Sequence, residues 1–331
     1  MVMGTRHGGS LSAAFLAAIV TLSISARDGC AQQLPDSAFR PPIPRPAYAN
    51  GNGPRLCLDE GHHNFHTLDN RFWAFGDLAG RDGFGVTPLR ATFSPAALAQ
   101  CELLVISNAQ WSDREWNEYP YPTPSAFTDA EIAAVRTWVE SGGRLLLIAD
   151  HMPLAGSAAK LAAAFGAQFI DGFAYRGFPA GADSVTRAAM MSQPTLFVTE
   201  DGTLAAHSIV RGRDSTERVT QVRSFTGQPF RLDVTGAQPV LLLPDDYISL
   251  EPRVAWQFEP TTPVRPVGGW LQGATLRVGR GRVAFFGEAA MFSAQVAGPQ
   301  RRPMGMNAPM AEQNARFVLN TLHWLTGLID P

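Results

Sequence analysis

The hydrophobic positions of this chain fall into short unbroken runs, separated by segments in which apolar side chains recur at helical spacing. Such runs are typical of strands buried on both faces of a sheet. They span residues 55–59, 84–89, 103–107 and 144–149. Between them, Phe72, Phe75 and Leu78 indicate a helix, and shorter helices are expected around 95–100 and 157–165. This alternation predicts an α/β fold with a parallel sheet covered by helices on both faces.

The strongest helix signal begins at Thr128. Thr128 and Glu131 have the spacing of a capping box, in which each side chain accepts the other residue's backbone N–H. Val135 and Val139 continue one apolar face, and a pair of glycines at 142–143 marks the end of the helix. The helix therefore leads directly into the last of these strands.

Residues from about 175 to 280 follow a different pattern. Short apolar runs lie between Pro, Gly and Asp turns, which predicts a β-rich insertion in the sheet domain. Val278 and Val283 flank a Gly-Arg-Gly-Arg turn and indicate a hairpin. The second strand of that hairpin, residues 283–288, returns to the core, and an amphipathic helix at 310–328 closes the domain.

The N-terminus has the features of a secretory signal peptide. A weakly basic start precedes the apolar run 11–24, and the small residues Gly29-Cys30-Ala31 follow where a cleavage site is expected. We expect residues 1–31 to be removed and the protein to be periplasmic or secreted. Acylation of Cys30, as in a lipoprotein, stays an alternative, although Arg27 stands where such a signal needs an apolar residue.

The remaining chain is expected to form one domain. Residues 32–54 are rich in Pro, Gly and Asn and lack apolar periodicity, which predicts a leader ahead of a fold that spans 55–331. The apolar run of the signal peptide is too short to cross a bilayer, and no later stretch is longer. We therefore expect no transmembrane segment in the mature chain.

The composition supports a globular protein. Of the 331 residues, 45% are hydrophobic and 17% charged. The formal net charge is −2 and no run of Lys or Arg stands out, so nucleic-acid binding has no electrostatic basis. Cys57 and Cys101 remain after cleavage. They can form one bridge in an oxidising compartment, but their apolar surroundings favour two small packing residues.

Polar and ionisable side chains follow several of the expected strands. In an open parallel sheet, ligands bind in the crevice outside the carboxyl ends of the strands. The residues at these ends are Asp59, Glu60, His62, His63 and Asn64 after the first strand, Asn108 after the third, Asp150 and His151 after the fourth, and Glu288 after the last. Because these strand ends share one edge, we expect Asp59, either His62 or His63, Asp150 and His151 to meet in one pocket.

These residue types suit proton transfer. Histidine titrates near neutral pH, and a neighbouring Asp can orient it or share its proton. We interpret Asp59, His62, His63, Asp150 and His151 as catalytic, and Glu60, Asn64, Asn108 and Glu288 as ligand-binding. The alternative is structural: the acids cap helices or tie down loops, and the histidines complete the hydrogen bonds around them. For His66 both interpretations stay open.

Metal and nucleophile chemistry have weaker signals. A divalent metal held by Asp59, His62 or His63, and His151 is one hypothesis, since histidine is the commonest metal ligand. The sequence has no HExxH or CxxC pattern that would specify a metal. It also lacks the Gly-x-Ser-x-Gly elbow of serine hydrolases.

The loop from residue 110 to residue 127 is rich in aromatic side chains. It carries Trp111, Trp116, Tyr119 and Tyr121 among prolines and acids. One interpretation is a packed surface loop. The other is an aromatic platform or lid over the crevice, a surface suited to sugar-like or other flat ligands.

A likeness to a known family rests on four segments: residues 59–64 (DEGHHN), residues 127–151 from the capped helix to Asp150-His151, Gly287-Glu288, and the closing helix at 314–325. They resemble the class I glutamine amidotransferase-like superfamily, and within it an exported branch related to sheet domains of gliding-motility and intraflagellar-transport proteins. The resemblance covers roughly residues 55–170 and 275–328 and implies a flavodoxin-like sheet. It does not imply amidotransfer, because the catalytic Cys in its Gly-x-Cys-x-Gly setting is missing.

We therefore expect an exported enzyme of hydrolase type that acts on a small polar or carbohydrate-like substrate. The alternative is a non-catalytic periplasmic domain that binds a ligand or serves as a scaffold through the same crevice. An enzyme needs its acid–base groups within hydrogen-bond reach, whereas a binding domain tolerates their separation.

Overall fold

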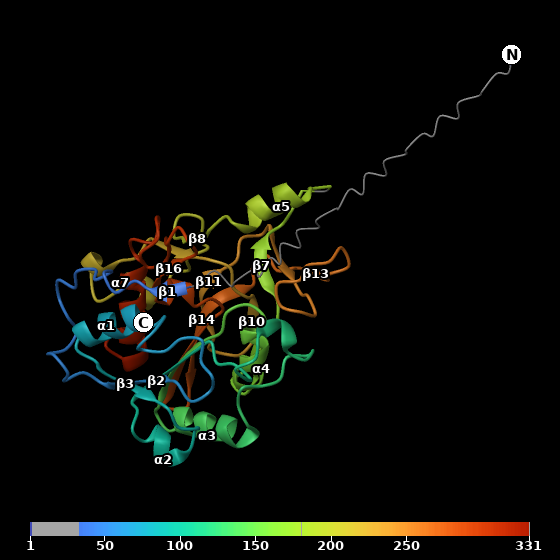
Figure 1. The fold of residues 1–331 in the computed structure, drawn as a ribbon. Helices are drawn as coiled ribbons and strands as arrows, with labels where there is room; N and C mark the ends of the chain where they lie inside the picture. Colours follow the sequence, from blue (N-terminus) through green and yellow to red (C-terminus); the bar gives the residue numbers. More distant parts are fainter. Residues whose placement is uncertain (2–32, 180, 331) are drawn as a thin grey trace.

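The computed structural model describes Met1, residues 33–179 and residues 181–330 (Figure 1). The expected signal peptide, residues 1–31, lies outside the described residues except for Met1. Within the described ranges, no helix is both long enough and apolar enough to cross a membrane.

Parallel strands form the centre of the largest sheet. In spatial order they are β3 (Gly85–Leu89), β2 (Arg55–Asp59), β4 (Leu103–Ser107), β5 (Arg144–Ile148) and β15 (Gly281–Phe286). Counted along the chain, this order is 2-1-3-4-5, which is the strand order of flavodoxin-like folds. The flavodoxin-like α/β fold predicted from the sequence is confirmed.

Helices cover both faces of this sheet. Leu56 and Leu58 of β2 pack on one face with α1 and α7, whereas Cys57 between them packs on the other face with α2, α3 and α4. The helices are α1 (Trp73–Arg81), α2 (Pro95–Leu98), α3 (Asp129–Glu140), α4 (Leu154–Ala163) and α7 (Asn314–Thr326). Because successive residues of a strand point to opposite faces, helices on both sides explain why the strands are apolar without a break.

Helix α3 begins where the sequence predicts. Glu131 donates its N–H to the Thr128 hydroxyl at 3.3 Å, and its carboxylate accepts the Thr128 N–H at 2.9 Å, so the capping box is complete. Val135 and Val139 are buried on the sheet. Gly142, at φ +114°, ends the helix in a backbone conformation that favours glycine. Local chemistry thus sets both ends of this helix.

The other half of the sheet is antiparallel and comes largely from the expected β-rich insertion. The hairpin predicted around the Gly-Arg-Gly-Arg turn joins β14 to β15. β14 spans Leu271–Val278, and the strands beyond the hairpin are β10 (Phe230–Leu232), β11 (Gln238–Leu242) and β6 (Ala167–Phe169). One small sheet of the insertion consists of β7 (Phe173–Arg176), β12 (Tyr247–Leu250) and β13 (Val264–Pro266), and another consists of β8 (Thr195–Val198) and β9 (Gln221–Ser224). The insertion also contains the short helices α5 (Ser184–Met191) and α6 (Ser208–Arg211).

Residues 33–54, called here the N-terminal arm, lie against the domain. The sequence prediction placed them ahead of the fold as a leader, whereas the structure packs them on it. β1 (Gln33–Pro35) pairs with β16 (Ala294–Ala297), a strand that also pairs with β17 (Arg302–Gly305). Further along the arm, the ring of Tyr48 meets that of Phe84 edge-on, with centroids 5.2 Å apart.

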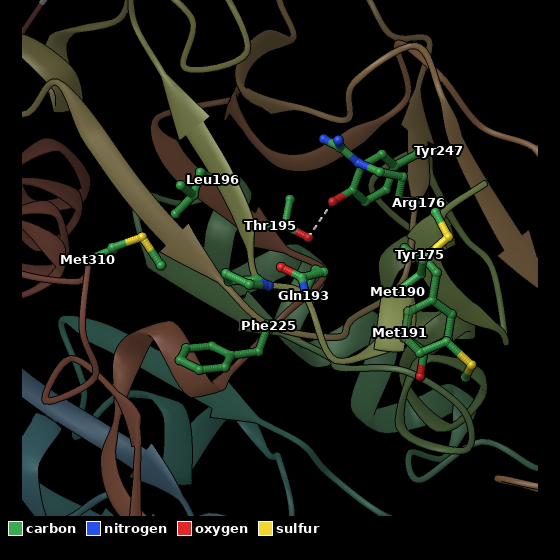
Figure 2. A pocket seen from close by; sticks show the side chains of 12 residues that line it. Tyr175, Arg176, Met190, Met191, Gln193, Thr195, Leu196, Phe225, Tyr247 and Met310 are labelled. Carbon is green, nitrogen blue, oxygen red and sulfur yellow. Dashed lines mark hydrogen bonds between the residues drawn. The ribbon is translucent and has the colours of Figure 1, made fainter. Parts of the chain in front are cut away.

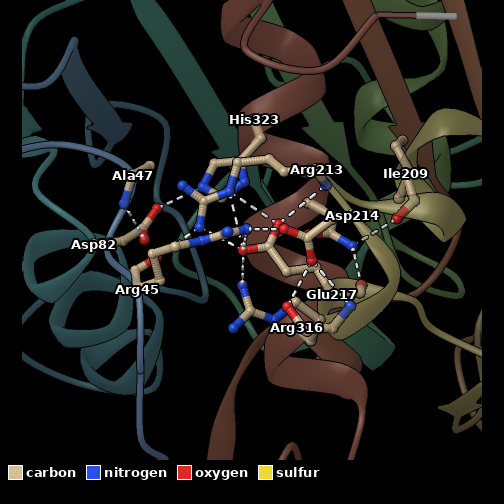
Figure 3. A network of polar contacts seen from close by, with 11 residues as sticks. Arg45, Ala47, Asp82, Ile209, Arg213, Asp214, Glu217, Arg316 and His323 are labelled. Carbon is tan, nitrogen blue, oxygen red and sulfur yellow. Dashed lines mark hydrogen bonds and ion pairs between the residues drawn. The ribbon is translucent and has the colours of Figure 1, made fainter.

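Two buried carboxylates hold the arm in place (Figure 3). Asp82 accepts the Ala47 N–H at 2.9 Å and a hydrogen from Nε2 of His323 at 2.6 Å. Glu217 lies 3.4 Å from Arg45 of the arm and also contacts two arginines of the domain. Burial raises the pKa of Glu217, but the bonds and charges of the arginines outweigh it and hold that pKa at about 2. Because these partners are far apart in the sequence, the composition of the arm does not predict the contacts.

Cys57 and Cys101 form a disulfide, with their Cα atoms 5.6 Å apart. The bridge links β2 to the segment just before β4, and the two cysteines are 44 positions apart in the sequence. Both residues are buried. The sequence allows this disulfide but favours two unbridged packing residues. The structure has the disulfide.

Candidate functional site

The residues selected from the sequence do lie at the carboxyl ends of β2, β4, β5 and β15, but they form two clusters rather than one pocket. The Asp59 cluster comprises Asp59, His62, Asn64 and Glu131. The Asp150 cluster comprises Asp150, His151 and Glu288. The loop after β4 connects the two clusters.

In the Asp59 cluster, the ring of His62 is bonded on both sides. Its Nδ1 lies 2.8 Å from Oδ1 of Asp59, and its Nε2 lies 2.9 Å from Oε1 of Glu131. The rings of Phe93 and Phe127 pack against it, with centroids 4.4 and 4.8 Å away. His62 is 4% exposed and Asp59 is fully buried. Neither ring nitrogen is therefore left for a substrate.

The charges of this cluster reinforce one another. Burial lowers the pKa of His62, but the Asp59 and Glu131 carboxylates outweigh burial, so the net pKa is raised. Burial raises the pKa of Glu131, but bonds from His62, Thr128 and the Phe93 N–H lower it to about 2. The His62 ring, bonded to one carboxylate on each side, ties the loop after β2 to the first turn of α3. Glu131, for which the sequence predicts only a role in capping the helix, is the partner that completes this arrangement.

Asn64 belongs to the same support. Its amide nitrogen donates to Oδ2 of Asp59 at 3.0 Å, and its amide oxygen accepts the His62 N–H at 3.0 Å. Both ends of the side chain are thus engaged within the loop. Asn64 was expected to bind a ligand, and the structure places it as a brace for Asp59 and His62.

His63 and Glu60 point away from both clusters. His63, at φ +49°, turns outward, and its Nδ1 meets the exposed carboxylate of Asp113 at 2.6 Å. Glu60 accepts the Leu68 N–H at 2.8 Å and pairs with Arg90. The structure therefore does not bring His63 together with the other catalytic candidates, nor Glu60 with the other ligand-binding candidates.

His66 is part of the core of this edge. Its Nδ1 lies 2.8 Å from Oγ of Ser107, and its ring stacks on Phe72 at 4.5 Å. Burial, with a smaller contribution from the Arg71 charge, lowers the pKa of His66 to about 3. His66 therefore stays neutral at physiological pH and fills the space between β4 and α1.

Asn108 connects the two clusters. Its side-chain oxygen accepts the Asp150 N–H at 2.9 Å, and its carbonyl oxygen accepts the Phe65 N–H at 2.9 Å. Its own backbone sits at φ +49°, a conformation that asparagine tolerates better than most residues. Asn108 therefore fixes the position of Asp150 rather than facing a ligand.

The Asp150 cluster contains polar atoms that could still contact a ligand, namely Nε2 of His151 and the carboxylate of Asp150. The Nδ1–H of His151 donates to the Met152 carbonyl at 2.8 Å, which fixes the ring and puts the lone pair of the neutral form on Nε2. Nε2 makes no hydrogen bond with any described residue, and the carboxylate of Asp150 lies 4.0 Å from it. The two side chains are 9% and 14% exposed, so solvent reaches both.

Aromatic rings surround His151. It stacks on Phe173 at 4.7 Å, and Trp256 and Trp116 meet it edge-on at 4.6 and 5.8 Å. Trp256 is 45% exposed and has φ +66°, a strained conformation for a bulky residue. Trp116 comes from the aromatic loop 110–127, for which a packed surface loop and an aromatic platform both stay open. Trp256 was not found from the sequence, because it belongs to the insertion and carries no motif.

Glu288, which follows β15, is the third member of the Asp150 cluster. It is 1% exposed and accepts the N–H groups of Ala290 at 2.6 Å and Met291 at 3.0 Å. Burial, followed by the neighbouring charge of Asp150, raises its pKa well above the ordinary value. Burial also raises the pKa of Tyr175, and the Asp150 charge adds to this effect. The charge of Asp150 therefore acts on a buried carboxyl group and on a buried phenol.

Within the described part of the chain, no three His, Cys, Asp or Glu side chains are placed so as to hold a metal ion. The metal hypothesis joined Asp59 and His62 or His63 to His151. These residues lie in different clusters or point outward, so the structure gives that ligand set no support.

Comparisons with known proteins find similarity in the fold but not in the sequence. No protein-family model and no curated protein matches the sequence. Among solved structures, the mmIFT52 N-terminal domain is similar with a TM-score of 0.55 and 14% identity, covering 82% of this chain and 97% of that domain. A ThuA-like protein from Bacteroides uniformis has a TM-score of 0.44 and 11% identity, covering 84% of this chain and 93% of that one. Identities this low show similarity of fold alone and carry no statement about activity.

Proposed function

We propose that this chain is an enzyme of hydrolase type whose acid–base centre is the Asp150 cluster. The observation that carries the proposal is the geometry of His151: its Nδ1 is fixed by the Met152 carbonyl, and its Nε2 lies 4.0 Å from the Asp150 carboxylate. A water molecule can hydrogen-bond to both groups at about 2.8 Å. His151 would then accept the proton of the attacking water, and Asp150 would orient that water.

The substrate class that fits this edge is a small polar or carbohydrate-like molecule. Trp116 and Trp256 border His151, and exposed aromatic rings pack well against the apolar faces of sugars. The family proposal is the exported branch of the class I glutamine amidotransferase-like superfamily. The fold supports it, while amidotransfer is not part of it, since the chain has Asp150-His151 where that reaction needs its cysteine.

A non-catalytic binding or scaffolding domain is the second candidate. One observation favours it: the side chains of Asp59, His62 and Glu131 hydrogen-bond to one another. Much of the predicted catalytic set therefore supports the loop after β2 and does not face the crevice. On this proposal, the Asp150 cluster would hold a ligand without transforming it.

A turnover assay separates the two candidates. Purified protein is tested against p-nitrophenyl acetate and a panel of p-nitrophenyl glycosides, with His151→Gln as the test variant and His63→Gln as a matched control at the same sheet edge. An acid–base role predicts a loss of at least about a hundredfold for His151→Gln and little change for His63→Gln. Equal activity of both variants, or no turnover alongside unchanged ligand binding, would rule out the catalytic proposal.

We also propose that the chain is exported. The apolar run 11–24 and the Gly29-Cys30-Ala31 site motivate it, and the Cys57–Cys101 disulfide supports it, because such bridges persist in oxidising compartments. N-terminal sequencing of protein from the exported fraction should begin near Gln32. An intact Met1 in that fraction, or two free thiols before reduction, would contradict the proposal.

A further inference from the structure

Helix α5 of the insertion stands between hollows that the proposed function does not use. None of its residues is buried. A cavity of about 300 Å³ lies on one side, bounded by β7, β8 and β12, and we call it the α5 pocket. A groove of about 730 Å³ lies on the other side of the helix, against β12 and β13. The two hollows share Met191 but differ in their charged residues.

The walls of the α5 pocket are largely apolar, as Figure 2 shows. Tyr175, Met190 and Met191 lie on one side in this view, and Leu196, Phe225 and Met310 lie on the other. Methionine side chains are unbranched and polarisable, so they adapt to flat ligands of differing shape. Pockets of this size with apolar walls and a few polar groups are typical of sites for small organic molecules.

The polar groups gather on one side of the pocket. The hydroxyls of Thr195 and Tyr247 are bonded at 2.8 Å, and both residues are 4% exposed. Arg176 lies beside the Tyr247 hydroxyl and is the one charged residue among the described residues that line the pocket. Its Nε is 3.3 Å from Asp246, but both side chains are 54% exposed, and water weakens such pairs. Asp246 is not among the described residues that line the pocket, so Arg176 brings a positive charge to this side of it.

We propose that the α5 pocket binds a small organic anion with a flat apolar body, such as an aryl or acyl carboxylate. The apolar body would lie between the methionines and Phe225, and the carboxylate would meet Arg176. A guanidinium is well suited to this contact because it presents planar N–H groups to the two carboxylate oxygens. The charge of the rim thus favours an anion over a neutral or cationic molecule.

This site is separate from the proposed catalytic centre. Asp150, His151 and Glu288 are not among the residues that line the α5 pocket. Tyr175 lines the pocket, and its hydroxyl side is near Asp150, since the Asp150 charge raises the pKa of Tyr175. Anion binding in the α5 pocket therefore does not depend on whether the Asp150 cluster is catalytic.

Two fluorescent probes test the proposal on the mature chain. Anilinonaphthalene sulfonate has a flat apolar body and one negative charge, and phenylnaphthylamine has a similar body without the charge. We expect saturable binding of the sulfonate at one site. Arg176→Gln should weaken it about tenfold, as expected for the loss of one charge-assisted contact, and change binding of the neutral probe less than about twofold.

The matched control is Arg187→Gln. Arg187 lines the groove on the other side of α5, so its replacement should leave sulfonate binding unchanged. A second variant, Gln193→Trp, fills the α5 pocket from its exposed rim and should abolish binding of both probes. Melting temperatures confirm that the variants are folded. Unsaturable binding, weakening by Arg187→Gln instead of Arg176→Gln, or full binding by Gln193→Trp would each overturn the proposal.

Discussion

Acidification should destabilise this protein through His66. The pKa of His66 is lowered from about 6.5 in the unfolded chain to about 3 in the folded one, chiefly by burial. Between these values the unfolded chain binds the extra proton and the folded chain does not. The stabilisation that depends on neutral His66 is therefore complete above about pH 6.5 and is lost as the pH falls towards 3.

The size of the effect follows from the same two values. Each pKa unit corresponds to about 1.4 kcal/mol. At pH 4.5 the loss relative to pH 7 is therefore roughly 2 to 3 kcal/mol, out of a total stability that is typically about 5 to 15 kcal/mol. His62 works in the opposite direction, because its pKa is raised and its stabilising charge is retained at low pH. A variant is needed to isolate His66.

His66→Gln supplies that variant, since glutamine does not titrate and its amide can still donate to Ser107. Urea unfolding followed by Trp fluorescence at pH 7, 5.5 and 4.5 gives the free energy of unfolding of both proteins. We expect the wild type to lose roughly 2 to 3 kcal/mol more than His66→Gln between pH 7 and pH 4.5. His63→Gln, an exposed control, should follow the wild type. Parallel pH profiles for wild type and His66→Gln would refute the reasoning.

Three other outcomes are expected. Reducing the Cys57–Cys101 bridge should lower the free energy of unfolding by about 4 kcal/mol, the chain-entropy value for its 44-residue separation, measured by urea unfolding with and without dithiothreitol. Glu131→Gln should cost roughly 2 to 3 kcal/mol, because His62 loses a charge-assisted partner, and the pKa of His62 followed by NMR should fall towards its ordinary value. His151→Ala should unfold within a few degrees of the wild type in a thermal melt while losing turnover or ligand binding, whereas a large drop in melting temperature with unchanged binding would mark it as a packing residue.

Elements set by local chemistry could be predicted from the sequence. The capping box of Thr128 and Glu131 and the hairpin between Val278 and Val283 depend on residues a few positions apart, and both occur as expected. The 2-1-3-4-5 strand order depends on contacts between distant segments and could be inferred only through the family resemblance. The apolar strands themselves carry no information about their neighbours.

The candidate site shows the same limit. The sequence placed the polar residues at the correct edge of the sheet, but it could not say which atoms stay available. His62 and His63 are adjacent, yet one is buried between Asp59 and Glu131 and the other is exposed beside Asp113. Their partners Glu131 and Asp113 lie 69 and 50 positions away. Such pairings follow from the fold and have no local signature.

The N-terminal arm has a practical consequence for recombinant work. A protein that starts at Arg55 would lack β1 and leave β16 with one open edge, which invites pairing with another chain. Asp82 would lose the Ala47 amide, and Glu217 would lose Arg45. Expression vectors should therefore begin at or before Gln33, and an affinity tag is better joined to the opposite terminus, where it does not compete with the first strand.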